Sequence, residues 1–360
     1  MTHPQLGQQR LFSQRVSRQL CTTPAEVVRW MGAMQAQDYG QSLWAIGARM
    51  QSPAVDTVEK AIAAGDILRT WPMRGTIHWV PAEDARWMVN LCAGRVANAH
   101  ARRLKQLELS EDDLARCGDI FVEALSGKHC QSRGDLLQQV EDAGISMAGQ
   151  RGYHALTYHA HRALLCIGPM QGKQQTFALL DDWASNPRDL SGDAALAELA
   201  NRFFVSHGPA TEYDFARWTG LTVTDSRRAI ELTTVPLITQ EIDGATHWLT
   251  EETADSAGDS QVYLLAGFDE FLLGYKDRDP VLPPEHANKI VPGNNGMFKP
   301  IIVVDGVVVG TWQRKLKKKA VDFTFDLFVP DSKLAKQASE QASTYADFMG
   351  LPIGKIEDSS

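Results

Sequence analysis

Gln35, Gln37 and Asp38, near the N-terminus, are the residues whose types and spacing could act on a substrate. A primary amide is not a strong base, but its carbonyl oxygen accepts hydrogen bonds and carries partial negative charge. Two such oxygens directed at one point could orient a water molecule and stabilise a developing positive charge. Asp38 is a candidate general base or water-orienting group. The spacing also leaves open that the glutamines are ordinary solvated side chains and that Asp38 is a carboxylate at a helix end.

A helix is predicted directly before this pair. Thr23 and Glu26 form the Thr-x-x-Glu pattern of a capping box, and apolar residues then follow at helical spacing up to Met34. Gly32 and Gly40 weaken the helix near its end, so the glutamines are expected in its last turn or just past it. Side chains two positions apart diverge on a regular helix, but in an irregular or extended segment they can face the same way.

The length of 360 residues predicts two or more domains, and 44% hydrophobic with 22% charged residues is typical of a soluble globular protein. The sequence has no run of apolar residues long enough to cross a membrane and no signal-peptide pattern. Five scattered cysteines without a Cys-x-x-Cys pair indicate reduced thiols in the cytoplasm rather than disulfides or a zinc site. We expect no metal and no cofactor, because neither zinc-ligand spacing nor a phosphate-binding glycine loop is present.

The net charge of −8 conceals two basic regions. Residues 1–105 contain 13 Lys/Arg against 7 Asp/Glu, whereas residues 106–200 contain 7 against 14 and residues 201–360 contain 16 against 23. A second basic region is the run from Arg314 to Lys319, with five cations in six residues. Local potential rather than net charge decides where a polyanion binds, although a charge run can also be a solvated face.

One arrangement of elements recurs three times. The patterns Thr23–Glu26, Ser132–Asp135 and Thr211–Asp214 each begin an apolar-periodic helix. Each is preceded by another amphipathic helix, expected at 11–20, 114–125 and 194–205. Each unit ends in a strand pair, expected at 67–71 with 76–80, 164–170 with 176–180, and 237–242 with 246–249. Two helices followed by a hairpin are the plan of a winged helix, a module that binds duplex DNA, and the recurrence strengthens this interpretation.

From residue 261 the apolar pattern changes to the period of a β-strand. Strands are expected at 262–268, 300–304, 307–313 and 321–329, with Asp305-Gly306 as a hairpin turn and a closing helix at 331–348. This part predicts a small barrel or a curled sheet. Residues 274–296 form a long polar loop, a kind of segment that is usually functional or mobile. The expected domains are the three recurring units at 1–105 (with an Arg-rich helical linker), 106–190 and 191–255, followed by the C-terminal sheet domain at 256–360. A boundary loop at 250–260 separates this last domain from the third unit.

Four motifs occur in one order along the chain: Gln35-Ala36-Gln37, residues 68–78 (LRTWPMRGTIH), residues 268–278 (FDEFLLGYKDR) and residues 305–312 (DGVVVGTW). Together they resemble the AlkZ-type, YcaQ-related bacterial DNA glycosylases, and the likeness extends from about residue 5 to the C-terminus. These are winged-helix proteins that unhook interstrand crosslinks and remove N7-alkylated purines. The resemblance implies an α+β multidomain fold, with three tandem winged helices scaffolded by a C-terminal β-barrel-like domain.

The resemblance also implies that Gln35 and Gln37 are catalytic, because the family's Gln-x-Gln pair falls on them. A sister branch has Gln-x-Asp, and Asp38 lies one position too late for that pattern. N7 alkylation gives the purine a positive charge, so the base leaves as a neutral group and needs no protonation. Two glutamines can therefore suffice for cationic lesions. With no lysine nucleophile near the pair, we expect a monofunctional glycosylase without strand cleavage.

The expected partner is double-stranded DNA with alkylated or crosslinked purines, bound by a monomer in the cytoplasm and at the nucleoid. Candidate DNA-binding residues are Arg69 and Arg74 beside the first hairpin, Arg278 in the long loop, and Lys317, Lys318 and Lys319 in the basic run. Trp71 and Trp79 are expected in the core, and His78 is expected to bond within the hairpin. A non-catalytic winged-helix regulator or lesion sensor is the alternative, because winged helices serve both purposes.

Overall fold

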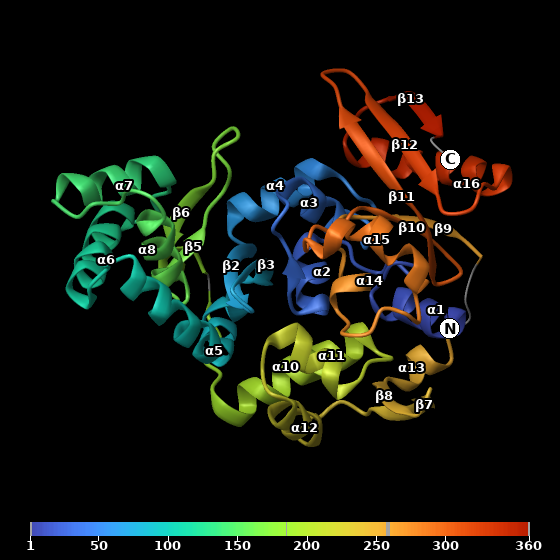
Figure 1. The fold of residues 1–360 in the computed structure, drawn as a ribbon, viewed down its shortest axis with the longest axis horizontal. Coiled ribbons are helices and arrows are strands. Elements are labelled where there is room, and N and C mark those ends of the chain that lie inside the picture. The colour runs from blue at the N-terminus through green and yellow to red at the C-terminus, as the bar shows by residue number, and fades with distance from the viewer. Residues whose placement is uncertain (1, 185, 257–259, 359–360) are drawn as a thin grey trace.

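Helices and strands both occur throughout the described chain in an α+β fold (Figure 1). The computed structural model describes residues 2–184, 186–256 and 260–358. The predicted boundary loop at 250–260 includes residues 257–259, which lie outside the described residues. None of the described helices combines the length and the apolar character that crossing a membrane requires.

The first unit contains the helix predicted before the glutamines. Helix α2 (Pro24–Met31) begins with a capping box in which Thr23 accepts from the Glu26 backbone and Glu26 accepts from the Thr23 backbone. Strand β1 (Met34–Gln35) follows directly. The other elements of this unit are α1 (Pro4–Ser13), α3 (Tyr39–Gly47), α4 (Val55–Ala64), β2 (Ile67–Met73), β3 (Thr76–Pro81), η1 (Ala82–Asp84) and α5 (Ala85–Gln106).

The helix predicted at 11–20 was wrong in position. Helix α1 begins at Pro4, which suits the first helical position because proline has no backbone N–H to satisfy there. It ends at Ser13, and Arg15 adopts a φ of 61°, which a right-handed helix does not contain. The predictions also lacked α3 and α4.

The second and third units contain the predicted helix pairs and hairpins. Ser132 and Thr211 are the N-caps of α7 and α11, as predicted. The second unit has α6 (Glu111–Leu125), β4 (Gln131–Ser132), α7 (Arg133–Asp142), α8 (Arg151–Ala160), β5 (Leu165–Ile167), β6 (Thr176–Leu179) and α9 (Leu180–Trp183). The third has α10 (Gly192–His207), α11 (Glu212–Thr219), α12 (Val223–Glu231), β7 (Ile238–Ile242), β8 (Ala245–Leu249) and α13 (Glu251–Ala254).

The first two hairpins share one six-stranded sheet with the order β1-β3-β2-β5-β6-β4. They meet through the pairing of Arg69 with Ile167, and β1 forms one edge. The third hairpin, β7–β8, is a separate two-stranded sheet. Its helices pack against β2, β3 and α5 in a shared apolar core that includes Phe203 and Trp218. That the three units are winged helices, and that domains divide near 105, 190 and 255, stays a prediction.

The C-terminal strands form an open sheet among the described residues, so the barrel alternative is not found and the predicted barrel-like domain is not confirmed. Within the described residues the order is β13-β12-β11-β10-β9, and the outer strands β13 and β9 do not pair with each other. Apolar cores cover both faces, one with α16 and the other with α1, so the sheet is a layer and has no reason to close. The elements are β9 (Val262–Leu265), α14 (Glu270–Leu273), η2 (Pro284–His286), α15 (Ala287–Ile290), η3 (Pro292–Asn294), β10 (Ile301–Val304), β11 (Val307–Leu316), β12 (Val321–Leu327), α16 (Ser332–Phe348) and β13 (Ile353–Asp358).

Candidate active site

Gln35 is the last residue of the edge strand β1 and lies opposite His78 of β3. Its side chain is buried, with 9% of the residue exposed. Its side-chain oxygen accepts from the backbone N–H of Ala36 at 3.2 Å, and that N–H also bonds the Ile77 carbonyl at 2.8 Å. The prediction that the glutamines lie just past the helix, in a segment that is not helical, is confirmed. Gln35 is therefore held in one place by the sheet.

Gln37 and Asp38 lie on the surface, two and three residues further on. Asp38 is the N-cap of α3, where its carboxylate accepts from the backbone N–H of Gln41 at 3.0 Å. The carboxylate therefore lies at the start of α3 and not at the end of the predicted helix, and among the described residues its other oxygen makes no hydrogen bond. No hydrogen bond between described residues joins the Gln35 and Gln37 amides. The segment thus contains one buried amide and one exposed amide, two residues apart.

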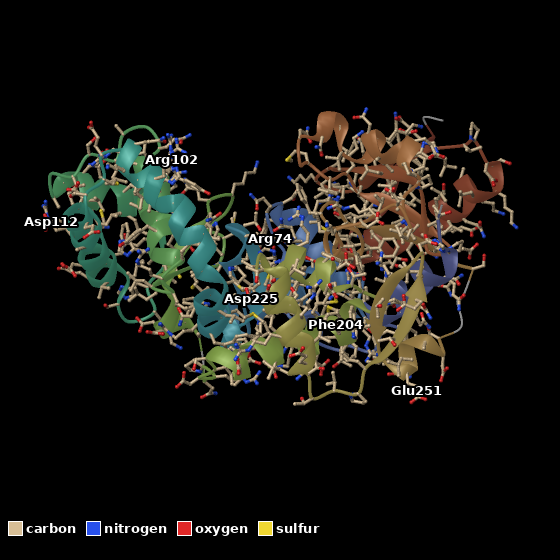
Figure 2. All side chains as sticks on the ribbon, turned by 60° about the horizontal axis from the view of Figure 1, so that its bottom comes forward. Arg74, Arg102, Asp112, Phe204, Asp225 and Glu251 are labelled. Carbon is tan, nitrogen blue, oxygen red and sulfur yellow. The ribbon has the colours of Figure 1, made fainter. Side chains whose placement is uncertain are left out.

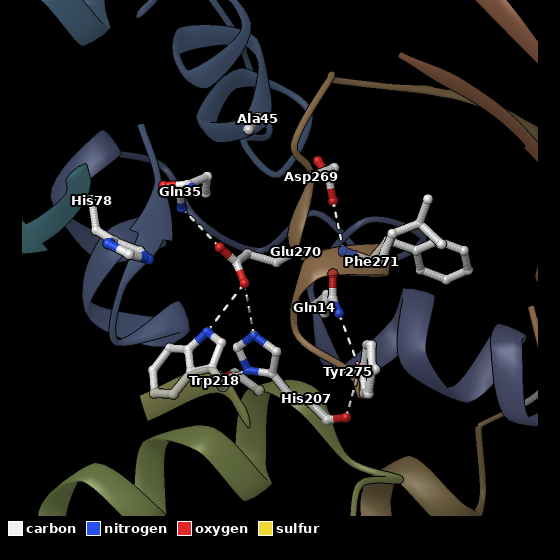
Figure 3. A network of polar contacts seen from close by, with 12 residues as sticks. Gln14, Gln35, Ala45, His78, His207, Trp218, Asp269, Glu270, Phe271 and Tyr275 are labelled. Atoms are coloured by element: carbon white, nitrogen blue, oxygen red, sulfur yellow. Dashed lines mark hydrogen bonds and ion pairs between the residues drawn. The ribbon is translucent and has the colours of Figure 1, made fainter. Parts of the chain in front are cut away.

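Residues 267–270 of the C-terminal part contact the first unit at three points, of which Figure 3 shows the bond between Glu270 and Gln35. The backbone N–H of Gly267 donates to the Gln41 side chain at 2.9 Å. Asp269 accepts two hydrogen bonds, at 2.8 and 3.0 Å, from the Arg49 guanidinium, and both side chains are buried. Glu270 accepts from the backbone N–H of Gln35 at 2.8 Å. Within the motif at 268–278, Glu270 therefore bonds the glutamine segment itself, and Asp269 bonds Arg49 beyond α3.

Glu270 is 1% exposed and connects three parts of the chain. Its second carboxylate oxygen accepts from the Trp218 indole at 3.1 Å and lies 3.8 Å from Nε2 of His207 (Figure 3). Burial opposes its ionisation, but His207 together with the charge of Arg74 lowers the pKa of Glu270 to about 2. The site therefore contains a buried carboxylate that is ionised at neutral pH.

His78 and Arg74 belong to the β2–β3 hairpin, which lies next to Gln35. Nδ1–H of His78 donates to the Thr76 carbonyl at 2.9 Å, so Nε2 accepts from the Arg74 guanidinium at 3.1 Å. Burial and the neighbouring Arg74 lower the pKa of His78 to about 3, which keeps the ring neutral. The expectations that His78 bonds within the hairpin and that Trp71 and Trp79 are core residues are confirmed.

The three arginines predicted to bind DNA differ in accessibility. Arg69 is 4% exposed, stacks near the rings of Tyr39 and Trp79, and has its pKa lowered to about 10 by burial. Arg74 is half-buried, lies in the middle of the molecule (Figure 2), and donates to the Arg217 carbonyl as well as to His78. Arg278 is also half-buried and donates to the Leu272 carbonyl at 2.9 Å. These arginines line the interior of the molecule more than its surface.

Comparison with known proteins identifies the class of protein. The family model for AlkZ-like DNA glycosylases matches residues 28–348, most of the chain. The chain belongs to the AlkZ-like DNA glycosylase family. It is similar to the interstrand DNA cross-link repair glycosylase of Streptomyces sahachiroi, with 28% identity over 342 residues that cover 84% of this chain and 87% of that protein. The structure of Streptomyces sahachiroi DNA glycosylase AlkZ has the same fold, with a TM-score of 0.83, 23% identity, and coverage of 99% of this chain and 100% of that chain.

The resemblance read from the four motifs and the assignment as a DNA glycosylase are thereby confirmed. Membership of a Gln-x-Gln branch stays a prediction. For an AlkZ-like glycosylase the exposed cations matter, and Lys317, Lys318 and Lys319 lie in the turn between β11 and β12. All three are exposed, and Lys317 forms an ion pair with Asp322.

Glu270, Trp218 and His207 were not predicted as site residues. Glu270 lies inside a quoted motif, and the signal was its position directly before the apolar residues 271–273. A carboxylate next to such a run is either solvated at a helix start or buried with partners, and the sequence does not distinguish the two. Trp218 and His207 resemble ordinary core residues until the fold brings them to Glu270.

Proposed function

We propose that this glycosylase hydrolyses the N-glycosidic bond of cationic N7-alkylated purines in duplex DNA, including interstrand crosslinks, without cleaving the strand. The observation that carries the proposal is the Gln35–Gln37 segment of the first unit, where a buried, hydrogen-bonded amide is followed two residues later by an exposed one. The name of the Streptomyces sahachiroi relative, an interstrand cross-link repair glycosylase, supports crosslinks as a substrate.

The chemistry fits neutral amides. When the C1′–N9 bond breaks, its electron pair goes to the purine and cancels the positive charge, so no acid is needed. The sugar becomes oxocarbenium-like, and an amide oxygen beside it stabilises that charge because the dipole is oriented before the reaction. Water held by Gln35 and Gln37 then attacks C1′ and loses its proton to solvent or to the free oxygen of Asp38. Asp38 is an auxiliary group in this scheme.

Duplex DNA is the proposed partner of a monomer, gripped by three winged-helix units and by the β11–β12 turn. Lys318 and Lys319 are fully available to phosphate, whereas Lys317 shares its charge with Asp322. Arg74 and Arg278 are proposed to contact DNA only where their half-buried side chains reach the surface, and Arg69, which is buried, is proposed to contact it least. A crosslinked base cannot swing out of the duplex, because it is tethered to the opposite strand. The proposal therefore requires an approach to the base within the duplex, unlike base flipping.

A single-turnover assay tests the proposal. Duplexes containing one N7-methylguanine, or one nitrogen-mustard crosslink, are incubated with excess enzyme and resolved on denaturing gels with and without alkali. We expect strand breaks only after alkali, and separation of the crosslinked strands. Absence of base release from both duplexes would overturn the proposed substrates.

Variants of the same chain test the proposed residues. The double variant Gln35→Ala/Gln37→Ala should lose excision while binding undamaged duplex like the wild type. The matched control is Gln138→Ala, an exposed glutamine of α7 in the second unit, which should excise normally. Wild-type rates in the double variant would remove the glutamines from the chemistry.

A further inference from the structure

The backbone N–H of Gln35 bonds away from its own sheet. Its neighbour Ala36 donates to Ile77 of β3 at 2.8 Å, so the N–H of Gln35 points to the open side of the edge strand. N–H groups at an edge usually bond water, but this one donates to a carboxylate oxygen of Glu270 at 2.8 Å. A hydrogen bond to an ionised acceptor is about twice as strong as a neutral one. The position of the Gln35 backbone therefore depends on Glu270.

Glu270 is itself fixed from the opposite side. The Trp218 indole of α11 donates to its second oxygen at 3.1 Å. Phe268, two residues earlier, has a φ of 60°, a conformation that is rare for a bulky side chain. Backbone strain of this kind persists only where the surroundings impose it, and it is found preferentially at functional sites. This turn carries Asp269 and Glu270 inward together.

The charge of Glu270 has no cation hydrogen-bonded to it among the described residues. Ser206 donates its hydroxyl hydrogen to the Arg202 carbonyl at 2.7 Å, so it must accept from Nδ1–H of His207 at 2.8 Å. His207 therefore turns Nε2 toward Glu270 at 3.8 Å, which is too far for a hydrogen bond. Burial lowers the pKa of His207 and so opposes a full positive charge on the ring. The charge of Arg74 lowers the pKa of Glu270. Its guanidinium, however, donates to His78 and to the Arg217 carbonyl and not to Glu270.

We propose that Glu270 is a positioning residue of this active site, which fixes the Gln35 backbone and supplies negative charge that favours a cationic sugar over a neutral one. At 1% exposure the carboxylate does not touch DNA and acts through Gln35. The proposal rests on the proposed glycosylase function. Through a partly buried medium, the single charge of Glu270 should change the preference for a cationic over a neutral sugar by about tenfold.

The test measures binding, so it does not require base release. Two duplexes differ only at one abasic site, which is either a cationic pyrrolidine analogue of the sugar or a neutral tetrahydrofuran. We expect the wild type to bind the pyrrolidine duplex more tightly. In Glu270→Gln, which keeps an acceptor for the Gln35 N–H, that preference should fall by about tenfold, with binding of undamaged duplex within about twofold of wild type.

Two further variants distinguish the effect of the Glu270 charge from the effect of its structural hydrogen bonds. Trp218→Phe removes a hydrogen bond to Glu270 but keeps the charge, so it should lower the melting temperature and leave the preference intact. Glu252→Gln removes one exposed charge far from the glutamines and should leave both unchanged. The proposal is overturned if Glu270→Gln retains the wild-type preference, if both affinities fall in parallel, or if the wild type itself has no preference. Failure of the wild type to release base from both the N7-methylguanine duplex and the crosslinked duplex, measured separately, would instead overturn the proposed function.

Discussion

Two lysines in the turn between β11 and β12, Lys318 and Lys319, are exposed cations in a chain of net charge −8. The neighbouring Lys317 forms an ion pair with Asp322, and its backbone N–H bonds the Ala320 carbonyl at 2.9 Å, so it helps to hold the turn. Lys318→Gln/Lys319→Gln therefore removes two charges from the turn and leaves its internal contacts in place. We expect this variant to bind undamaged duplex more weakly, whatever the lesion.

The size of the effect follows from the count of free cations. Each phosphate neutralised contributes about 0.9 to the slope of log affinity against log salt, so two lysines account for about 1.8. Between 50 and 200 mM salt, the affinity ratio of wild type to variant should therefore shrink by about 12-fold. Adding Lys317→Gln should change the slope by less than a further 0.9 or so, because Asp322 already offsets part of that charge.

Fluorescence anisotropy with a labelled duplex over this salt range measures the slope directly. The matched control is Lys333→Gln/Lys336→Gln, which removes the same charge from exposed positions on α16. Its slope should equal that of the wild type. If the turn variant and the control have the same slope, the turn does not contact phosphate and the reasoning from exposed cations is refuted.

Three further predictions concern the site and its support. Gln35→Ala and Gln37→Ala should each lower the single-turnover excision rate by less than the roughly 10²–10³-fold typical of a preorganised contact. If the two glutamines share one water, the double variant should lose less than the product of the two single effects. If Asp38→Asn abolishes excision while Gln37→Ala has no effect, the general base is Asp38. Arg49→Met should lower the free energy of unfolding by about 3–5 kcal/mol, because it leaves Asp269 buried and unpaired; a denaturant titration that finds less than 1 or so would contradict this. The pKa of His78 is about 3 in the folded chain against an ordinary 6.5, so between these values the unfolded chain binds more protons and the free energy of unfolding falls as pH decreases. His78→Gln should reduce the slope of the free energy of unfolding against pH in this range by at most about 1.4 kcal/mol per pH unit. Equal slopes in the wild type and the variant would contradict a buried neutral ring.

Local features of this fold could be predicted from the sequence. Thr23, Ser132 and Thr211 bond the backbone three residues ahead, which a short pattern encodes completely. Asp305-Gly306 turns with both residues at positive φ, as the pattern requires. The position of α1 could not be read in the same way, because the apolar spacing continues past the residue where Arg15 reverses the backbone.

Contacts between distant segments could not be predicted. Gln35 and Glu270 are 235 positions apart, and no local pattern encodes that pairing. For the same reason the sequence does not predict that the C-terminal sheet stays open, because closure of the five strands depends on which distant elements cover their faces. Here α1, from the other end of the chain, packs on one face through Leu6 and Leu11.

The different environments of Gln35 and Gln37 argue for different parts in the proposed chemistry. Gln35 is bonded through its backbone to Glu270, is paired to β3, and has its amide oxygen set against Ala36, so it can present a fixed dipole with little reorganisation. Gln37 is exposed and followed by a helix start, so it can exchange water with solvent. A fixed dipole is what stabilises a developing cation, whereas an exposed amide is suited to deliver the water that captures it. We therefore propose that Gln35, with Glu270 behind it, stabilises the developing charge and that Gln37 supplies the water.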